Sequence, residues 1–248
     1  MTINNSIIVK IGGKILENRE NLEFTLSQFK SLLHGDILQK VIIIPGGGLR
    51  ADFIRSMDDK LKIGDDLAHW MAIYAMNYNG VKLCNNFKEV NCTDNYEMLQ
   101  TWLKSENEKG IFVFLPYDYL SREDQLPHNW DVTSDSITLY LAYKLKLKEC
   151  YLIKDVDSIM INEKGQEKAI KEMTTSDYIK FKNSNRLESE MFGASKFKKS
   201  QPVDSYLLFL IDKTKVSCVL LNGIASKSRI LEYFDITKTQ NRTYTKIY

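Results

Sequence analysis

A run of four β-branched residues that ends in a proline and three glycines, VIIIPGGGLR at 41–50, constrains this chain more than any other stretch. The apolar run is short enough to be a β-strand buried on both faces. Glycine loses more conformational entropy on folding than any other residue, so three in succession need a structural or functional reason. Their missing side chains predict that some group comes close to the backbone where this strand ends.

A second apolar run ends in the same way. The segment SIIVKIGGK, residues 6–14, is typical of a buried strand that ends at Gly12 and Gly13. Backbone N–H groups in such turns, next to a helix N-terminus, bind anions. Two of these turns predict sites for two phosphates, or for a phosphate chain and an acidic group. The alternative for each turn is an ordinary tight connection between a strand and a helix.

Apolar runs and amphipathic segments alternate along the chain. Residues 20–34, 65–83 and 134–147 have helical spacing, and we expect the last of these helices to be capped at Ser134. The runs at 110–116 and 149–155 are typical of buried strands, and Gly165 marks a hairpin turn. This alternation predicts an α/β fold with a parallel or mainly parallel sheet between helical layers. Residues 182–202 interrupt it, as a mobile insertion or as a loop without function.

Several classes of protein are excluded by what the sequence lacks. Thirty-four Lys and Arg against 32 Asp and Glu leave a net charge of +2, so we expect no nucleic-acid partner. There is no GxxxxGK[ST] and no GxGxxG after the first strand, which argues against a P-loop and a dinucleotide site. No segment approaches the about 18 apolar residues of a membrane span, and no signal peptide is evident. We therefore expect a cytoplasmic protein with no membrane partner.

Charged residues next to the strand ends are candidates for chemistry. Lys10 precedes the first glycine turn and would direct its ammonium toward the same space. Asp135, in the first turn of a helix, could orient such a lysine for a transferring phosphoryl group, or could simply stabilise the helix dipole. Lys154, Asp155 and Asp157 follow another strand, where ligands of open α/β sheets collect, although KDVDS could be an ordinary acidic turn.

Four motifs in this order and spacing, VKIGGK, VIIIPGGG, TSDSITLYLA and LIKDVDS, resemble the amino acid kinase superfamily over nearly the whole chain. The resemblance implies a three-layer αβα sandwich around a mainly parallel sheet, formed by residues 1–248 as a single domain. Residues up to about 145 would form the acceptor-side half, and those from about 146 the nucleotide-side half, with 182–202 a flexible insertion. It further implies an ATP-dependent kinase that uses ATP and Mg²⁺, acts on a small molecule and forms a homo-oligomer.

The resemblance also implies roles for individual residues. Lys10 and Asp135 would be catalytic, and no side chain of the protein is expected to bind a metal. The ATP-binding residues would be Gly12, Gly13, Lys14, Lys154, Asp155 and Asp157. The acceptor-binding residues would be Gly46, Gly47, Gly48, Arg55 and Trp130.

Within the superfamily, HNWDVTSDS and LAHWMAIYAMN are most similar to archaeal kinases that phosphorylate a furan-methyl phosphate. This similarity implies a phosphate monoester as the acceptor. Arg55 could bind its phosphate bidentately, or could be a solvated helix residue. A function of another class stays open: a non-catalytic nucleotide- or oxoanion-binding protein with a sensor or storage role.

Three positions depart from the superfamily pattern. Lys14 stands where a small residue is usual, and Ser158 stands where DVDG has its glycine. Asp212 stands where we place the second catalytic lysine. We expect Lys215, in preference to Lys213, to replace that lysine, because a long side chain at the helix end could swing into the site. Alternatively, both lysines are solvated.

Overall fold

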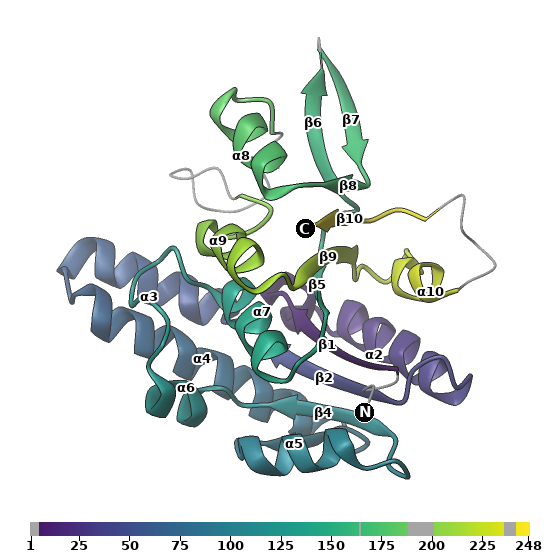
Figure 1. Ribbon diagram of the computed structural model, residues 1–248. Coiled ribbons are helices and arrows are strands. Elements are labelled where there is room, and N and C mark those ends of the chain that lie inside the picture. Colours follow the sequence, from purple (N-terminus) through teal and green to yellow (C-terminus); the bar gives the residue numbers. More distant parts are fainter. Residues whose placement is uncertain (1–4, 164, 188–200, 236–241) are drawn as a thin grey trace.

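The computed structural model describes residues 5–163, 165–187, 201–235 and 242–248. Its centre is an eight-stranded sheet with the order β3-β4-β2-β1-β5-β9-β10-β8 (Figure 1). The strands are β1 (Ser6–Ile11), β2 (Lys40–Pro45), β3 (Asn91–Thr93), β4 (Gly110–Phe114), β5 (Glu149–Lys154), β8 (Glu172–Met173), β9 (Ser217–Asn222) and β10 (Thr245–Ile247).

The sheet is mainly parallel, which confirms the prediction from the alternating pattern. The pairing of β10 with β9 is antiparallel, and the other pairs of the sheet are parallel. The chain passes from β1 to β2 on one side and later returns to β5 on the other. In open α/β sheets such a reversal leaves a crevice at the carboxyl ends of the strands, where ligands bind.

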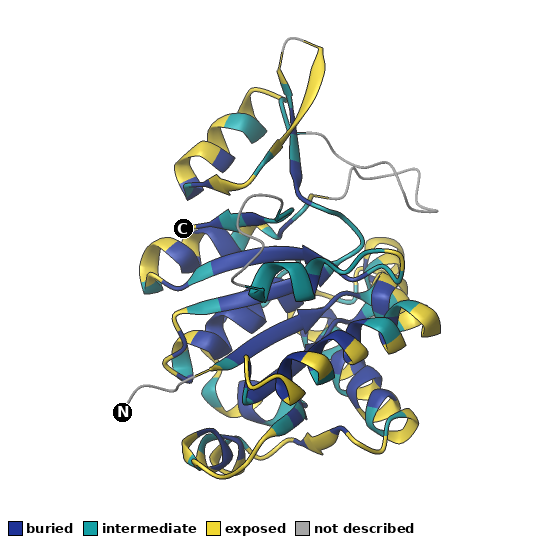
Figure 2. Ribbon diagram, turned by 90° about the vertical axis from the view of Figure 1, so that its right-hand side faces the viewer, coloured by how far each residue is buried: buried dark blue, intermediate teal, exposed yellow. Residues whose placement is uncertain are grey.

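Helices cover both faces of the sheet, so the molecule has three layers as expected (Figures 1 and 2). One face packs against α2 (Arg19–His34) and α10 (Arg229–Phe234), and the other against α5 (Tyr96–Lys104), α7 (Ser134–Lys144) and α9 (Ser205–Thr214). The remaining helices are α1 (Gly13–Glu17), α3 (Gly48–Leu61), α4 (Asp65–Asn86), α6 (Tyr117–Glu123) and α8 (Thr175–Asn183).

The alternation of side chains along β1 decides which residues reach the site. Ile7, Val9 and Ile11 face the α2 layer, while Ile8 faces the α7 layer. Successive side chains of a strand point to opposite faces, so Lys10 lies on the same side as Ile8, toward α7. The same rule places Lys154, at the end of β5, on the face of Cys150 and Leu152.

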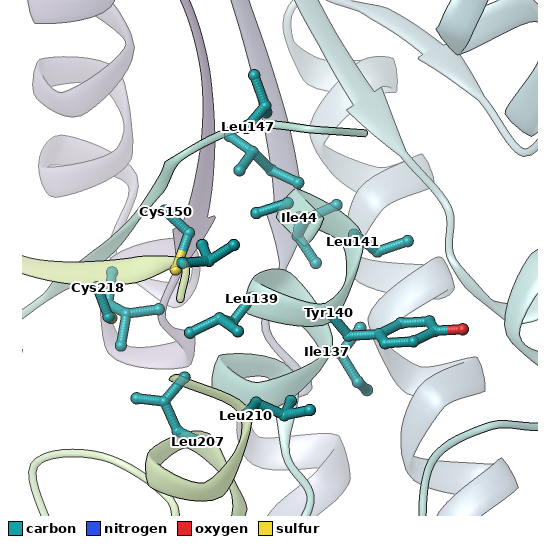
Figure 3. Packing of buried hydrophobic residues seen from close by; sticks show 14 of the residues in the cluster. Ile44, Ile137, Leu139, Tyr140, Leu141, Leu147, Cys150, Leu207, Leu210 and Cys218 are labelled. Atoms are coloured by element: carbon teal, nitrogen blue, oxygen red, sulfur yellow. The ribbon is translucent and has the colours of Figure 1, made fainter. Parts of the chain in front are cut away.

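Helix α7 is buried almost completely, which explains why its sequence lacks a polar face. Leu139 and Leu141 contact the core that continues into α9 through Leu207 and Leu210 (Figure 3). The helix begins at Ser134, but its N-cap is Thr133, whose side chain accepts from the Asp135 backbone N–H. The prediction of a cap at Ser134 was therefore wrong by one residue.

A two-stranded hairpin, β6 (Ile159–Glu163) and β7 (Gln166–Ile170), projects above the sheet beside α8 (Figure 1). Gly165 lies in its turn with φ +85°, as predicted. Thr245 of β10 fixes the hairpin base: its hydroxyl accepts from Ile159 N at 2.8 Å and donates to Ile170 O at 2.6 Å.

Two further expectations from the sequence concern the insertion at 182–202 and the lack of a membrane span. Most of the predicted insertion at 182–202 lies outside the described residues; its first residues complete α8 and the turn after it. In the part of the chain that the structure describes, no helix is both long and apolar enough to cross a membrane.

Candidate active site

A cavity of about 210 Å³ opens at the carboxyl ends of β1 and β5. Six of the residues predicted for the site line it: Lys10, Gly12, Gly13, Lys14, Lys154 and Asp155. The cavity also contacts Gln201 and Pro202, which lead into α9. The structure thus brings together the first glycine turn and the KDVDS turn, which are far apart in the sequence.

Two lysines share one buried carboxylate beside this cavity. Lys10 Nζ lies 2.9 Å from Asp135 Oδ1, and Lys154 Nζ lies 2.5 Å from Oδ2 of the same residue. Lys10 is 7% exposed and Asp135 is 3% exposed. Lys154 Nζ also donates to the carbonyl of Pro202 at 2.6 Å. Asp135 therefore does more than stabilise the dipole of α7: it sets the positions of two ammonium groups.

The electrostatics of this cluster follow from burial and from the opposite charges. Burial alone would raise the pKa of Asp135, but the charges of Lys10 and Lys154 outweigh it and lower the pKa to about 2. Burial lowers the pKa of Lys10, and the nearby Lys154 charge adds to this, although Asp135 opposes it. Asp135 is consequently ionised at neutral pH and has no tendency to accept a proton there.

Asp204 supports this cluster from α9 and was not predicted. One oxygen accepts from Thr133 N at 2.9 Å and Ser136 N at 3.0 Å, and the other accepts from Leu207 N at 2.8 Å. The hydroxyls of Thr133 and Ser136 donate to the same carboxylate. Asp204 therefore caps the N-termini of α7 and α9 together and fixes the backbone on both sides of Asp135. Burial, and then the charge of Asp135, raise its pKa.

The two glycine turns contact each other through their backbones. A Cβ on Gly13 would lie 2.4 Å from Gly48 Cα, and a Cβ on Gly46 would lie 3.2 Å from Gly13 N and 3.3 Å from Lys10 Cε. Side chains at Gly13 and Gly46 would force the two turns apart. The sequence predicted that some group comes close to the backbone at the three glycines. One such group is the backbone of the glycine turn after β1.

Polar side chains hold the second glycine turn in place. Asn79 of α4 donates to the carbonyls of Gly46 at 2.7 Å and Gly47 at 2.9 Å. Gly48 has φ +58°, a left-handed conformation that glycine adopts without strain. The Leu49 N–H, at the start of α3, donates to the Glu17 carboxylate. A carboxylate thus already contacts the start of this helix, where anions bind favourably.

Gly47 plays a different part from its neighbours. A Cβ there would lie 2.4 Å from Ala51 Cβ on α3, so its missing side chain allows the helix to pack rather than leaving room for a ligand. The binding of the acceptor by the backbone amides of the three glycines stays a prediction. Gly47 lacks a side chain because a Cβ there would collide with Ala51 in the first turn of α3.

Arg55 and Trp130, both predicted to bind the acceptor, lie against each other. The Arg55 guanidinium is 4.5 Å from the centre of the Trp130 ring, and Trp130 Nε1 donates to Asp58 Oδ2 at 2.9 Å. Among the described residues, the buried Nε of Arg55 has no hydrogen-bond partner. The pair lies on α3 and the loop before α7, outside the cavity that Lys10 and Lys154 line.

The two acidic residues of the KDVDS turn are paired with cations. Asp155 accepts from Lys14 Nζ at 2.6 Å, across the cavity, and Asp157 contacts Lys227 and Arg229. Among the described residues, no group of three or more His, Cys, Asp or Glu side chains could hold a metal ion. Mg²⁺ is usually bound by one or two carboxylates together with substrate phosphates, and Asp155 and Asp157 already have cationic partners.

The prediction for Lys215 does not agree with the geometry. Lys215 is the exposed C-cap of α9, and β9 begins two residues later, beside the start of β5. The cavity lies at the other end of these strands, because α9 starts near the site and runs away from it. Lys213 lies 5.7 Å from the Phe209 ring on the same helix. The structure brings neither lysine to the cavity.

The three positions that depart from the superfamily pattern have local physical explanations. Ser158 is buried and is absent from the described residues with positive φ, so this turn does not need glycine. Lys14 reaches Asp155 across the cavity mouth. Asp212 accepts from the Thr175 hydroxyl at 2.7 Å and joins α9 to α8.

Comparison with known proteins agrees with this geometry. The sequence model of the amino acid kinase family matches residues 5–197. A [5-(aminomethyl)furan-3-yl]methyl phosphate kinase of Methanocaldococcus jannaschii is 28% identical over 97% of this chain and 96% of its own length.

Solved structures show the same fold at lower identity. Uridylate kinase of Archaeoglobus fulgidus aligns with a TM-score of 0.63 and 15% identity, over 98% of this chain and 100% of its own. UMP kinase of Bacillus anthracis aligns with a TM-score of 0.67 and 15% identity, over 98% of this chain and 95% of its own.

Proposed function

The chain belongs to the amino acid kinase family and is an ATP-dependent phosphotransferase, and we propose that its acceptor is a small phosphate monoester, which it converts to a diphosphate. The same proposal assigns ATP binding to the cavity between β1 and β5, in the nucleotide-side half, and acceptor binding to the second glycine turn. Mg²⁺ would enter with the nucleotide phosphates.

Among the described residues beside the cavity, no carboxylate is free to act as a general base, and this supports the proposed class of acceptor. Asp135 is clamped between two lysines and has a pKa of about 2, and Asp155 and Asp157 are each paired with cations. An alcohol acceptor must lose a proton during phosphoryl transfer, which requires a base. A phosphate monoester has a second pKa of about 6 and already carries its nucleophilic oxygen as an anion at pH 7. This site suits an acceptor that needs no deprotonation.

The residues of the site would act by position and charge. Lys10 would donate to the oxygens of the transferred phosphoryl group, and Asp135 would hold the Lys10 ammonium in place. The amides of the second glycine turn, fixed by Asn79, would bind phosphate oxygens from the acceptor side. Phosphoryl transfer offers little covalent chemistry to the protein, so positioning and charge neutralisation supply most of the rate enhancement.

One observation favours a phosphate monoester over a carboxylate, and a second favours an anionic acceptor in general. The relative with 28% identity is named as a kinase of a furan-methyl phosphate. In addition, Arg55 is held against Trp130 and keeps an unpaired buried donor among the described residues. A guanidinium matches the geometry of both carboxylate and phosphate, so this pair supports an anionic acceptor of either kind. We assign Arg55 and Trp130 to the binding of the acceptor.

The test is an acceptor panel with ATP and Mg²⁺, followed by ³¹P NMR. The panel contains [5-(aminomethyl)furan-3-yl]methyl phosphate and other phosphate monoesters, acetylglutamate and aspartate as carboxylates, and the matching dephosphorylated alcohols. We expect a diphosphate product from at least one monoester and none from its alcohol. Turnover of carboxylates alone would contradict the proposed acceptor class.

The other function considered from the sequence, a non-catalytic sensor or storage protein, is not supported. The family match and the named kinase relative indicate an enzyme. The two positions that kept this alternative open are also explained locally, since Ser158 needs no positive φ and Asp212 bonds to Thr175.

We further propose that the protein forms a homo-oligomer through α3 and α4. These two helices expose an unusual number of large apolar side chains, and contiguous exposed apolar surface marks association sites. The exposed residues are Leu49, Phe53, Leu61, Leu67, Tyr74, Tyr78 and Val81. Light scattering should give the mass of an oligomer for the wild type and of a monomer for a Phe53→Glu/Tyr74→Glu variant.

A further inference from the structure

Helix α9 brings no positive charge to the cavity, although phosphoryl transfer benefits from several. Its lysines lie at the far end, and the residues that lead into it at the site are Gln201, Pro202 and Asp204. These are neutral or acidic. The charge spread over the oxygens of the transferred group needs more than Lys10, and Lys14, which also lines the cavity, is paired with Asp155. Among the described residues, a second cation for the transferred group must therefore come from an element other than α9.

Lys154 lies where such a cation is needed. It ends β5, which is paired with β1 in a register that places Lys10 opposite Leu152, two residues earlier. Its ammonium binds the second oxygen of Asp135 while Lys10 binds the first. It also contacts the Pro202 carbonyl, so it reaches the entrance to α9 from the opposite side. One carboxylate therefore holds two ammonium groups side by side at the cavity.

Gly12 keeps the space between these lysines open. A Cβ at this position would lie 3.6 Å from Lys10 Nζ and 3.8 Å from Lys154 Cγ. The backbone there is fixed, because Gly12 N donates to Ile153 O at 2.8 Å. The missing side chain leaves a hollow bordered by both lysines and by the first glycine turn.

The charge of the cluster suits an anion in this hollow. Lys10 and Lys154 together carry one more charge than Asp135 neutralises. The charge of the other buried carboxylate nearby, Asp204, is offset by the partial positive charges at the N-termini of α7 and α9, whose backbone N–H groups it accepts from. The lysine pair therefore keeps a net positive charge in a site with little solvent, where it interacts strongly with a phosphoryl group.

We propose that Lys154 is a second catalytic cation, which contacts the transferred phosphoryl group together with Lys10 and replaces a lysine from α9; this rests on the proposed kinase function. In the step, an acceptor oxygen forms a bond to the γ-phosphorus of ATP as the bond to the β,γ-bridging oxygen breaks. The electron pair of that bond leaves with ADP. Both lysines stay protonated and donate hydrogen bonds to the phosphoryl oxygens. Asp135 is a positioning residue for the pair.

The test compares Lys154→Ala with matched lysine controls in steady-state kinetics. We expect kcat to fall by about 10²-fold or more, with the KM for ATP changing by less than about tenfold, because the contact strengthens as charge develops in the transition state. Lys213→Ala and Lys215→Ala should keep the wild-type kcat. Circular dichroism and thermal melting establish that each variant is folded.

A second readout separates contact with the phosphoryl group from a purely structural role. Methylammonium or ethylammonium added to Lys154→Ala should restore part of kcat in a saturable way, because a small amine can occupy the vacated position. A residue that only positions Lys10 would not be rescued in this way.

Three results would overturn the proposal. They are a wild-type kcat in folded Lys154→Ala, a raised KM for ATP with unchanged kcat, and lost activity that no amine restores. Normal turnover by Lys154→Ala combined with loss in Lys196→Ala, Lys198→Ala or Lys199→Ala would transfer the role to lysines outside the described residues. If the wild type accepts only carboxylates, the proposed acceptor is wrong but the same comparison still tests Lys154.

Discussion

The two glycine turns of this protein follow neighbouring parallel strands, yet they are built differently. The first, after β1, leads into the short helix α1 and is surrounded by ionised side chains, with Lys10 and Lys14 on either side of Gly12 and Gly13. The second, after β2, leads into the 14-residue helix α3 and is held mainly by neutral hydrogen bonds from Asn79.

The difference indicates a division of work between the turns. Charge is concentrated at the first turn, where Asp135 gathers the ammonium groups. Backbone geometry is controlled at the second, where φ +58° at Gly48 and the contact of Gly13 with Gly48 leave little freedom. Changes at the first turn should affect the chemical step, and changes at the second should affect acceptor binding and stability.

The largest expected effect is that of Lys10→Ala. Removal of a buried ammonium that neutralises the transferred group should lower kcat by about 10²-fold or more. The fold should persist, because Asp135 keeps its ion pair with Lys154. Steady-state kinetics together with a thermal melt measure both quantities. A folded variant with unchanged kcat would show that the first turn does not carry the charge used in catalysis.

Asn79→Ala tests the second turn. Loss of the donor to two buried carbonyls should lower the free energy of unfolding by about 1–3 kcal/mol. The KM for the acceptor should rise more than the KM for ATP, because the loosened turn belongs to the acceptor side. Asn79→Asp, which has the same shape but cannot donate from a carboxylate, should behave similarly. An increase confined to the KM for ATP would reverse the assignment of the turns.

Acid should lower the stability of the fold in two pH windows, one set by His69 on α4 and one set by Asp135 beside the first glycine turn. Burial, reinforced by His128, lowers the pKa of His69 on α4 to about 4, so the folded state disfavours its charged form. The unfolded state then binds more protons between pH 6.5 and 4, and stability should fall by about 1–2 kcal/mol as the pH drops through that window.

The pKa of Asp135 is also lowered, but here the folded state favours the charged form, and the pH window is lower. Its folded pKa of about 2 lies below the unfolded value of 3.8, so its contribution is present above pH 3.8 and lost toward pH 2. Urea unfolding from pH 7 to 3 should show the first loss in the wild type and a smaller one in His69→Gln. An identical pH dependence in both proteins would exclude His69 as the cause.

The smallest expected effect is that of Lys14→Ala. Its ion pair with Asp155 is partly exposed, and exposed pairs contribute about 0–1 kcal/mol. We expect a change of less than about tenfold in the KM for ATP and a nearly unchanged kcat. Lys10→Ala is the matched comparison on the same turn. A loss in kcat as large as that of Lys10→Ala would make Lys14 part of the chemistry.

Much of the fold and part of the site could be predicted from the sequence, since the information is local. Continuous apolar runs predicted β1, β2, β4 and β5, and residues next to their ends include Lys10 and Lys154. Short elements without clear periodicity were missed, such as β3, which has three residues, and α8. Their formation depends on neighbouring strands and helices more than on their own residues.

The predictions for the site failed for two reasons: the direction in which α9 runs, and contacts between residues that are far apart in the sequence. Lys215 was chosen because a long side chain at the end of the helix could swing into the site, but a helix between parallel strands runs back across the sheet, so its end lies opposite the site. Asn79 is one polar residue within a long helix, and nothing local shows that it bonds to Gly46. Asp204 is an acidic residue before a helix, which predicts a cap for α9 but not for α7.

The carboxylate of Asp204 accepts from backbone N–H groups at the N-termini of both α7 and α9, so these two helix N-termini should move together. Ser136 N and Leu207 N donate to the same side chain, and Asp135 lies between Thr133 and Ser136. A displacement of Pro202–Asp204 would therefore pull on the carboxylate that sets the spacing of Lys10 and Lys154. In hydrogen exchange, the amides of Ser136 and Leu207 should open together, at one shared rate that nucleotide binding slows for both.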